Sequence, residues 1–273
     1  AGMYAQKQTV KGNSDPNEAK LVAPQIKLLS SDNETSVISF SFSNFDFRQV
    51  ETSRGLVQIP ILPDATPMLV KDAPDLPKLT RSVIIPDKAE MQVEVVSEQY
   101  LDYPNIEIAP SKGNLTRDID PASIPYNYGK VYYENEFFPK EIVNLRKPYI
   151  LRDYRGQTVV VYPFRYNPVT KVLRVYHNIV INISKKSENG INKFVNKNPN
   201  IKPTFEFDKI YSNQFLNYSS PKYTPVSENG NMLIISDASY LSAMQPLIEW
   251  KIKSGRNVYI VDVASIGDTT AIK

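Results

Sequence analysis

The chain of 273 residues is close to electrically neutral, since 32 lysines and arginines against 29 aspartates and glutamates give a formal net charge of +3. A charge this small, with no basic stripe along the sequence, argues against nucleic acid as a partner. The absence of cysteine excludes disulfides, thiolate metal sites and a cysteine nucleophile within these residues, and the single histidine argues against a zinc site.

The first 24 residues are predicted to be a tail. The small residues of AGMYAQ resemble the end of a secretory signal whose leader would precede the numbering, although an ordinary disordered terminus is the simpler interpretation. Residues 7–24 are polar and poor in bulky apolar side chains, which is typical of disorder. No apolar run approaches the ~18–20 residues of a membrane helix, so we expect no membrane span.

Alternation of apolar and polar residues predicts strands from residue 36 onward. Ile38, Phe40 and Phe42 alternate with serines, which are expected to form an open face. Phe45 and Phe47 continue the series on the opposite parity, which predicts a bulge or bend near Asn44. Further strands are predicted at 55–62, 81–86, 91–97, 148–152, 157–164 and 171–184.

The sequence YNPVTK is a turn signature, so the two predicted strands that flank it, 157–164 and 171–184, should form a hairpin. His177 shares its parity with the apolar positions of the second strand, which favours a structural histidine over a catalytic base. The many strands, the proline turns and the 17 tyrosines and 11 phenylalanines predict an antiparallel β-sandwich or barrel over about residues 25–203.

One long connection in this part has no periodic pattern. APSKGNLTRDIDPASIPYNYG, residues 109–129, contains three prolines and two glycines, which rule out a regular strand or helix through it. Loops of this length in compact domains are uncommon and are usually functional or disordered. Arg117 and Asp118 stand at its middle, and Lys112 carries a similar charge without an assigned role. Taken alone, Arg117 reads as a solvated loop arginine.

We find no self-sufficient active site in the sequence. Glu134, Glu136 and Glu141 lie close together beside two phenylalanines, but carboxylate catalysis requires separation across a cleft, so a solvated face is favoured. None of the glycines has the spacing of a phosphate-binding loop. We therefore assign no catalytic residue and no metal ligand.

A different architecture is predicted after residue 204. FEFDKIYSNQFLNY has helical spacing through Phe207, Ile210 and Leu216, and the polar stretch 217–231 then reads as an exposed linker and domain boundary.

The stretch from residue 232 to residue 263 predicts one parallel βαβ unit. The continuous apolar run at 232–235 is typical of a strand buried on both faces, and 257–263 is the second strand. Between them a helix through Lys253, capped by Asp237 or Ser239, should be kinked or divided by Pro246. One such unit cannot cover its own sheet, so it is too small for a flavodoxin-like domain and should begin a larger one.

Several long blocks resemble the precursors of gingipains, secreted bacterial cysteine endopeptidases specific for basic residues. They are APSKGNLTRDIDPASIPYNYG, FFPKEI, ILRDYRGQ, RYNPVTKVLRVY, NYSSPKYTPVSENG and MLIIS…LIEWKIKSGRNV, in the family's order and nearest its arginine-specific members. The resemblance runs from about Gln25 to the C-terminus. It implies that 25–222 is a β-sandwich propeptide, an inhibitor and folding aid, and that 223–273 begins a caspase-like α/β peptidase domain. The catalytic cysteine and histidine would lie beyond residue 273, so this chain would not be an enzyme.

The same resemblance gives the long loop a role. Propeptides of the family block their enzyme by placing an arginine in its primary specificity pocket, and Arg117, followed by Asp118, stands at that position in LTRD. An acidic pocket selects a guanidinium group through paired charge-assisted hydrogen bonds. A proline-stiffened loop presents the group with less ordering entropy to lose. The implied partner is the cognate peptidase domain.

The implied maturation junction is Lys222–Tyr223, in the exposed linker. Arginine-specific precursors have an arginine where this chain has Lys222, and an ammonium group does not reproduce the guanidinium fork. Either the parent enzyme accepts lysine, another processing protease cuts here, or the junction has been altered so that processing is slow.

An alternative function is an extracellular carbohydrate-binding or adhesive module. Its stacking platform would consist of Tyr126, Tyr128, Tyr132 and Tyr133. The resemblance favours the propeptide, exported through the periplasm to the cell surface or the extracellular space. It implies no cofactor for this chain and leaves calcium in the parent peptidase domain an open question.

Overall fold

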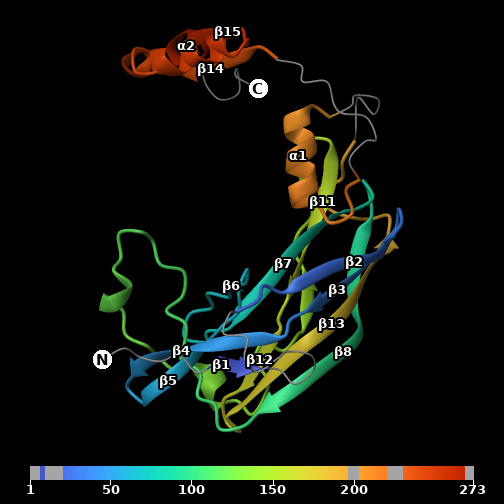
Figure 1. Cartoon of the computed structure of the whole chain (residues 1–273), viewed down its shortest axis with the longest axis vertical. Coiled ribbons are helices and arrows are strands. Elements are labelled where there is room, and N and C mark those ends of the chain that lie inside the picture. The colour runs from blue at the N-terminus through green and yellow to red at the C-terminus, as the bar shows by residue number, and fades with distance from the viewer. Residues whose placement is uncertain (1–6, 10–20, 196–202, 220–229, 268–273) are drawn as a thin grey trace. The chain divides into compact units, whose positions relative to one another are not determined.

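The computed structural model describes residues 7–9, 21–195, 203–219 and 230–267. The chain divides into two compact units, residues 1–199 with 210–220, and residues 200–209 with 221–273. Figure 1 shows a first unit built mainly of strands and a short α/β second unit. The prediction of a mainly β chain is confirmed.

The described residues of the first unit form three antiparallel sheets. The smallest has the order β1 (Lys7–Thr9), β4 (Asn44–Thr52), β5 (Gly55–Ile61), so that a strand lies within the predicted N-terminal tail. The second has the order β10 (Tyr149–Leu151), β11 (Tyr154–Val161), β7 (Pro77–Ile84), β6 (Thr66–Pro67), with β9 (Val143–Leu145) also on β11. The third has the order β12 (Phe164–Asn167), β13 (Val172–Ser187), β3 (Thr35–Ser41), β2 (Gln25–Ser31), with β8 (Glu90–Tyr103) along β13.

One hydrophobic core joins these sheets. Alternate residues of β3 are buried, as the period-two pattern predicts, and they share a cluster with inward residues of the other two sheets. At its centre Phe45 packs edge-on against Phe47, Phe164 and Tyr103, at centroid distances of 5.2, 5.1 and 5.6 Å. Burial of these rings together with the aliphatic residues of the same cluster stabilises the unit.

The predicted bend near Asn44 is confirmed, and it is a change of sheet. The chain leaves β3 at Ser41 in the third sheet and begins β4 at Asn44 in the smallest one, which is why the phenylalanines change parity. The serines of β3 do not form the open face that we expected. Ser39 is half-buried because the larger Val180 and Lys27 flank it on the same side of the sheet.

The predicted hairpin exists, but its first strand differs from the prediction. Phe164 pairs with Val175 across the turn, so β12 and β13 form the hairpin. The predicted strand 157–164 is split, because β11 ends at Val161 in the second sheet and β12 begins at Phe164 in the third. Pro163 lies at the crossing and has no N–H with which to continue a ladder.

The helix predicted after residue 204 is α1 (Phe205–Gln214). Ile210 is 44% exposed, whereas Tyr211 and Phe215 are buried. A Cβ atom on Gly156 of β11 would lie 2.4 Å from the Phe215 ring, so a glycine is needed where this ring packs on the strand.

The second unit confirms the βαβ prediction. β14 (Met232–Ser236) and β15 (Val258–Asp262) are parallel, and α2 (Gln245–Lys253) lies between them in the chain. Pro246 divides the helical stretch between the two strands. Asp237 caps a 3-10 helix, η3 (Ala238–Tyr240), and α2 then begins beside the proline. A short helix, α3 (Val263–Ile266), follows β15. The run 232–235 is not fully buried, because Leu233 is 57% exposed. Within the described residues no helix is long and apolar enough to span a membrane.

Candidate functional site

The predicted irregular loop projects from the first unit, where Figure 1 shows it in green. Its two ends, Ser111 and Gly129, are fixed to the turn at Asp72 and Ala73. The Asp72 N–H donates to Ser111 O (2.9 Å), the Ser111 N–H to Ala73 O (2.8 Å), and the Gly129 N–H to Asp72 O (2.9 Å). A Cβ atom on Gly129 would lie 2.7 Å from Asp72 O, so only glycine allows this approach.

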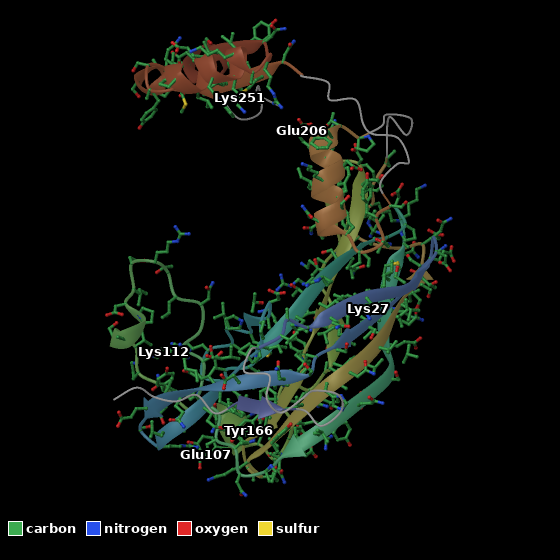
Figure 2. All side chains as sticks on the ribbon, viewed as in Figure 1. Lys27, Glu107, Lys112, Tyr166, Glu206 and Lys251 are labelled. Atoms are coloured by element: carbon green, nitrogen blue, oxygen red, sulfur yellow. The ribbon has the colours of Figure 1, made fainter. Side chains whose placement is uncertain are left out.

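The N-terminal limb of the loop is closed by Lys112, at the base of the loop in Figure 2. Its Nζ donates to Pro121 O (2.7 Å) and lies 4.2 Å from the centre of the Tyr126 ring. Pro121 opens a 3-10 turn, η1 (Pro121–Ser123), which Asp120 caps by accepting from the Ala122 N–H. Lys112 is therefore a structural staple of the loop, a role that its sequence context did not indicate.

Arg54 fixes the C-terminal end of the loop. This residue lies in the turn between β4 and β5, and its guanidinium carbon is 3.8 Å from the centre of the Tyr128 ring. Its Nη2 donates to the Tyr133 hydroxyl (3.3 Å), and Thr52 Oγ1 and the Tyr128 hydroxyl are 2.8 Å apart. Nothing in the local sequence predicts this clamp, because its partners are far apart along the chain.

Arg117 lies in a turn at the exposed part of the loop. The Ile119 N–H donates to Thr116 O (3.2 Å), which places Arg117 and Asp118 at the two central positions. A hydrogen bond from Thr116, followed by one from its own backbone, lowers the pKa of Asp118. Arg117 is exposed and makes no hydrogen bond or ion pair with any residue that the structure describes.

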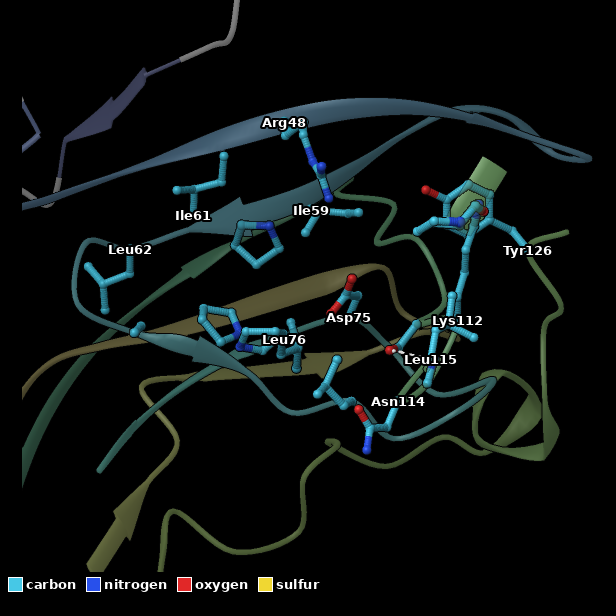
Figure 3. A pocket seen from close by; sticks show the side chains of 18 residues that line it. Arg48, Ile59, Ile61, Leu62, Asp75, Leu76, Lys112, Asn114, Leu115 and Tyr126 are labelled. Atoms are coloured by element: carbon cyan, nitrogen blue, oxygen red, sulfur yellow. Dashed lines mark hydrogen bonds between the residues drawn. The ribbon is translucent and has the colours of Figure 1, made fainter. Parts of the chain in front are cut away.

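A groove of about 600 Å³ lies beside the N-terminal limb of the loop (Figure 3). Its walls are mainly apolar and include Ile59, Leu62 and Leu76, while Leu115 and Pro121 come from the loop itself. Asp75 points into it, and Arg48 of β4 faces it from the opposite wall. Burial raises the pKa of Asp75, and the Arg48 charge opposes that shift only in part. Sequence patterns did not single out Asp75.

The tyrosine platform of the alternative function is not formed. Tyr126 and Tyr128 are covered by Lys112 and Arg54, and Tyr132 is 6% exposed with its hydroxyl donating to Ile108 O (2.9 Å). Tyr133, at 69% exposure, is the one widely exposed member of the four. A sugar-stacking surface needs several open ring faces, so the geometry argues against this function.

The other residues weighed from the sequence do not form an active site in the described part of the chain. His177 is half-buried at an irregularity of β13 instead of on its buried face, and burial lowers its pKa. Glu134 pairs with Lys130 (3.4 Å) and Glu136 with Lys140 (2.6 Å), as on a solvated face. Among the described residues no cluster of three or more metal-ligating side chains is present. Lys222 and Tyr223 lie outside the described residues.

The comparison with family models gives the class of protein to which this β domain with its fixed loop belongs, that of propeptides. The Propeptide_C25 model matches residues 17–224. The chain therefore belongs to the C25 propeptide family, as the sequence resemblance implied.

Known proteins refine this assignment. The chain is 40% identical over 257 residues to Gingipain R1 of Porphyromonas gingivalis, covering 92% of this chain and 25% of that protein. It is 25% identical over 283 residues to Lys-gingipain HG66 of the same organism, covering 99% of this chain and 16% of the relative. Among solved structures, the chain is similar to one chain of a complex of P. gingivalis RgpB pro- and mature domains, with 40% identity and a TM-score of 0.66. The match covers 72% of this chain and the whole of the other. The chain thus spans about a quarter of the length of Gingipain R1.

Proposed function

We propose that the first unit is the inhibitory propeptide of a gingipain-like cysteine endopeptidase zymogen, and that Arg117 occupies the primary specificity pocket of the cognate peptidase domain. The observation that supports this is an exposed arginine, without a partner among the residues that the structure describes, on a loop that is fixed at both ends. The similarity to a propeptide solved with its mature domain adds to it.

The loop geometry suits an inhibitor. Hydrogen bonds at both ends and the Lys112 and Arg54 contacts order the backbone before binding, so less conformational entropy is lost in the complex. The guanidinium of Arg117 remains free to donate paired hydrogen bonds to a carboxylate in the pocket. Asp118, the second site residue, occupies the other central position of the tip turn that the Ile119 N–H closes on Thr116 O.

Maturation in this proposal removes the propeptide by cleavage near Lys222–Tyr223. The chain is more similar to Gingipain R1 than to Lys-gingipain HG66, which supports a parent enzyme that prefers arginine. Such an enzyme would cleave slowly after Lys222, or a second protease would do so. Residues from 223 onward would then begin a caspase-like peptidase domain, and the precursor would be exported through the periplasm to the cell surface or the extracellular space.

The test of Arg117 is a titration of the 273-residue chain and its variants against the mature peptidase of the same precursor. We expect Arg117→Ala to weaken inhibition about 30- to 1000-fold, the range of a central binding residue. Arg117→Lys should also lose affinity for an arginine-specific enzyme, because the charge remains but the fork is lost. A lysine-preferring parent would tolerate it.

The matched control is Lys27→Ala. Lys27 is exposed on β2, away from the loop in Figure 2, so its loss removes one positive charge without touching the loop. Lys112 does not serve this purpose, because its staple is part of the loop. If the Arg117→Ala and Lys27→Ala variants both inhibit as the wild type does, the inhibitory contact lies elsewhere.

A further inference from the structure

We infer that the groove beside the loop is a second docking site, which receives a lysine or arginine side chain of the cognate peptidase domain against Asp75. This inference rests on the proposed function and names a further contact between the same two partners.

The first observation is a carboxylate without a partner. Asp75 accepts no hydrogen bond and forms no ion pair with the residues that the structure describes, although its backbone N–H donates to Ala109 O (2.9 Å). Two cations of the chain line the same groove. Arg48 faces Asp75 without reaching ion-pair distance, and Lys112 is already bound to Pro121 and Tyr126. The Asp75 carboxylate is therefore available to pair with a cation of another protein.

The walls of the groove select the kind of cation. They are mainly apolar, and two rim residues, Ile61 and Leu69, are 38% and 42% exposed. A lysine or arginine side chain fits this environment, because its alkyl stem packs on apolar surface while its head reaches the carboxylate. A purely apolar occupant would bury the Asp75 charge unpaired, which is costly.

The position of the groove points to the peptidase domain as the source of that side chain. Residues 112–115 of the inhibitory loop form part of the wall, so a partner that engages this limb also meets the groove. An exposed apolar patch rimmed by polar residues is typical of a protein interaction site.

Asp75 also weakens the free chain. Burial raises the pKa of Asp75, and the positive charge of Arg48 opposes this rise. Tyr132 is the titratable neighbour that faces Asp75. For an acid whose pKa is raised in the folded state, the stabilising contribution is present below the ordinary value of 3.8 and is lost as pH rises through the raised value. At neutral pH the ionised group therefore reduces stability. A group that destabilises the free protein and finds its partner in a complex is a feature of binding sites.

Asp75→Asn tests the inference because two effects of opposite sign are expected. The variant keeps the shape of the side chain and removes the charge, so the 273-residue chain should become more resistant to urea at neutral pH, with no gain at a pH below 3.8. Inhibition of the mature peptidase should weaken at least tenfold, since a partnered charge is lost at the interface. A residue with only a structural role would not raise stability and weaken inhibition together.

The control is Asp64→Asn. Asp64 is an exposed carboxylate in the turn between Leu62 and Ala65, two residues that line the groove, and its φ of 58° is tolerated by asparagine. It makes the same change in net charge and should leave inhibition unchanged.

Three outcomes would overturn the groove inference. In the first, Asp75→Asn inhibits as the wild type does, and in the second it inhibits no more weakly than Asp64→Asn. In the third, Asp75→Asn destabilises the chain, which would show that the carboxylate has an intrachain partner. If Arg117→Ala weakens inhibition while Asp75→Asn does not, the inference about the groove fails and the proposed function stands. If neither variant weakens inhibition, the assignment of Arg117 to the specificity pocket fails as well.

Discussion

Arg155 of β11 is fully buried although it carries a charge, and we expect this single side chain to contribute strongly to the free energy of unfolding. Its guanidinium donates to four carbonyl oxygens, those of Pro86, Ala89, Ile191 and Asn192, at 2.6 to 2.9 Å. Replacing it by methionine fills a similar volume but leaves these acceptors without donors. We expect Arg155→Met to lower the free energy of unfolding by about 3–5 kcal/mol, as measured by urea denaturation.

Arg146→Met serves as the control, because Arg146 is exposed and its side chain makes no hydrogen bond with the described residues. We expect it to change the free energy of unfolding by less than about 0.5 kcal/mol. A similar urea midpoint for both variants would contradict the role assigned to Arg155.

The loop of residues 109–129 is held in shape by side chains and not by a regular hydrogen-bond ladder. Lys112 closes one limb on Pro121 and Tyr126, and Arg54 holds the other end at Tyr128. Arg54→Ala and Lys112→Ala should each speed amide exchange in the loop, at Ile119 and Ser123, and weaken inhibition about tenfold because more ordering is then required on binding. Hydrogen exchange followed by mass spectrometry measures the first effect.

A double-mutant cycle separates positioning from general damage. If Arg54 and Lys112 act by holding the loop for Arg117, their effects on inhibition should shrink when Arg117 is already alanine. Lys130→Ala is the control, since Lys130 follows Gly129 and its exposed side chain pairs with Glu134, which lies outside the loop. Unchanged amide exchange in both alanine variants would remove the argument for preorganisation.

At the scale of the whole molecule the two units differ in how well they cover their apolar residues. The first unit has a continuous core of its own, whereas in the second Trp250, Tyr259 and Leu233 are 60%, 56% and 57% exposed. We expect residues 25–222 to unfold cooperatively in urea without added metal, and residues 223–273 by themselves to be unfolded or to aggregate. Protected amides at 233–235 and 258–261 in the short fragment would contradict this.

Several features of the protein follow from the sequence because they depend on neighbours along the chain. Side-chain alternation sets strand positions such as 55–62, and proline and glycine content identifies 109–129 as irregular. The apolar runs and Pro246 predict the divided βαβ unit correctly. Sequence blocks resembling a known family pointed to Arg117, whereas the bare pattern indicated only a solvated arginine.

Only the tertiary structure decides how these elements combine. The predicted strand 157–164 is divided between two sheets, α1 buries Tyr211 instead of Ile210, and Asp75 acquires its groove from segments that local patterns do not connect. The hydrogen bond from Arg54 to Tyr133 joins residues separated by 79 positions. Strand pairing, burial and pKa depend on such distant contacts, whose formation is set by the packing of the whole domain, so local periodicity carries no information about them.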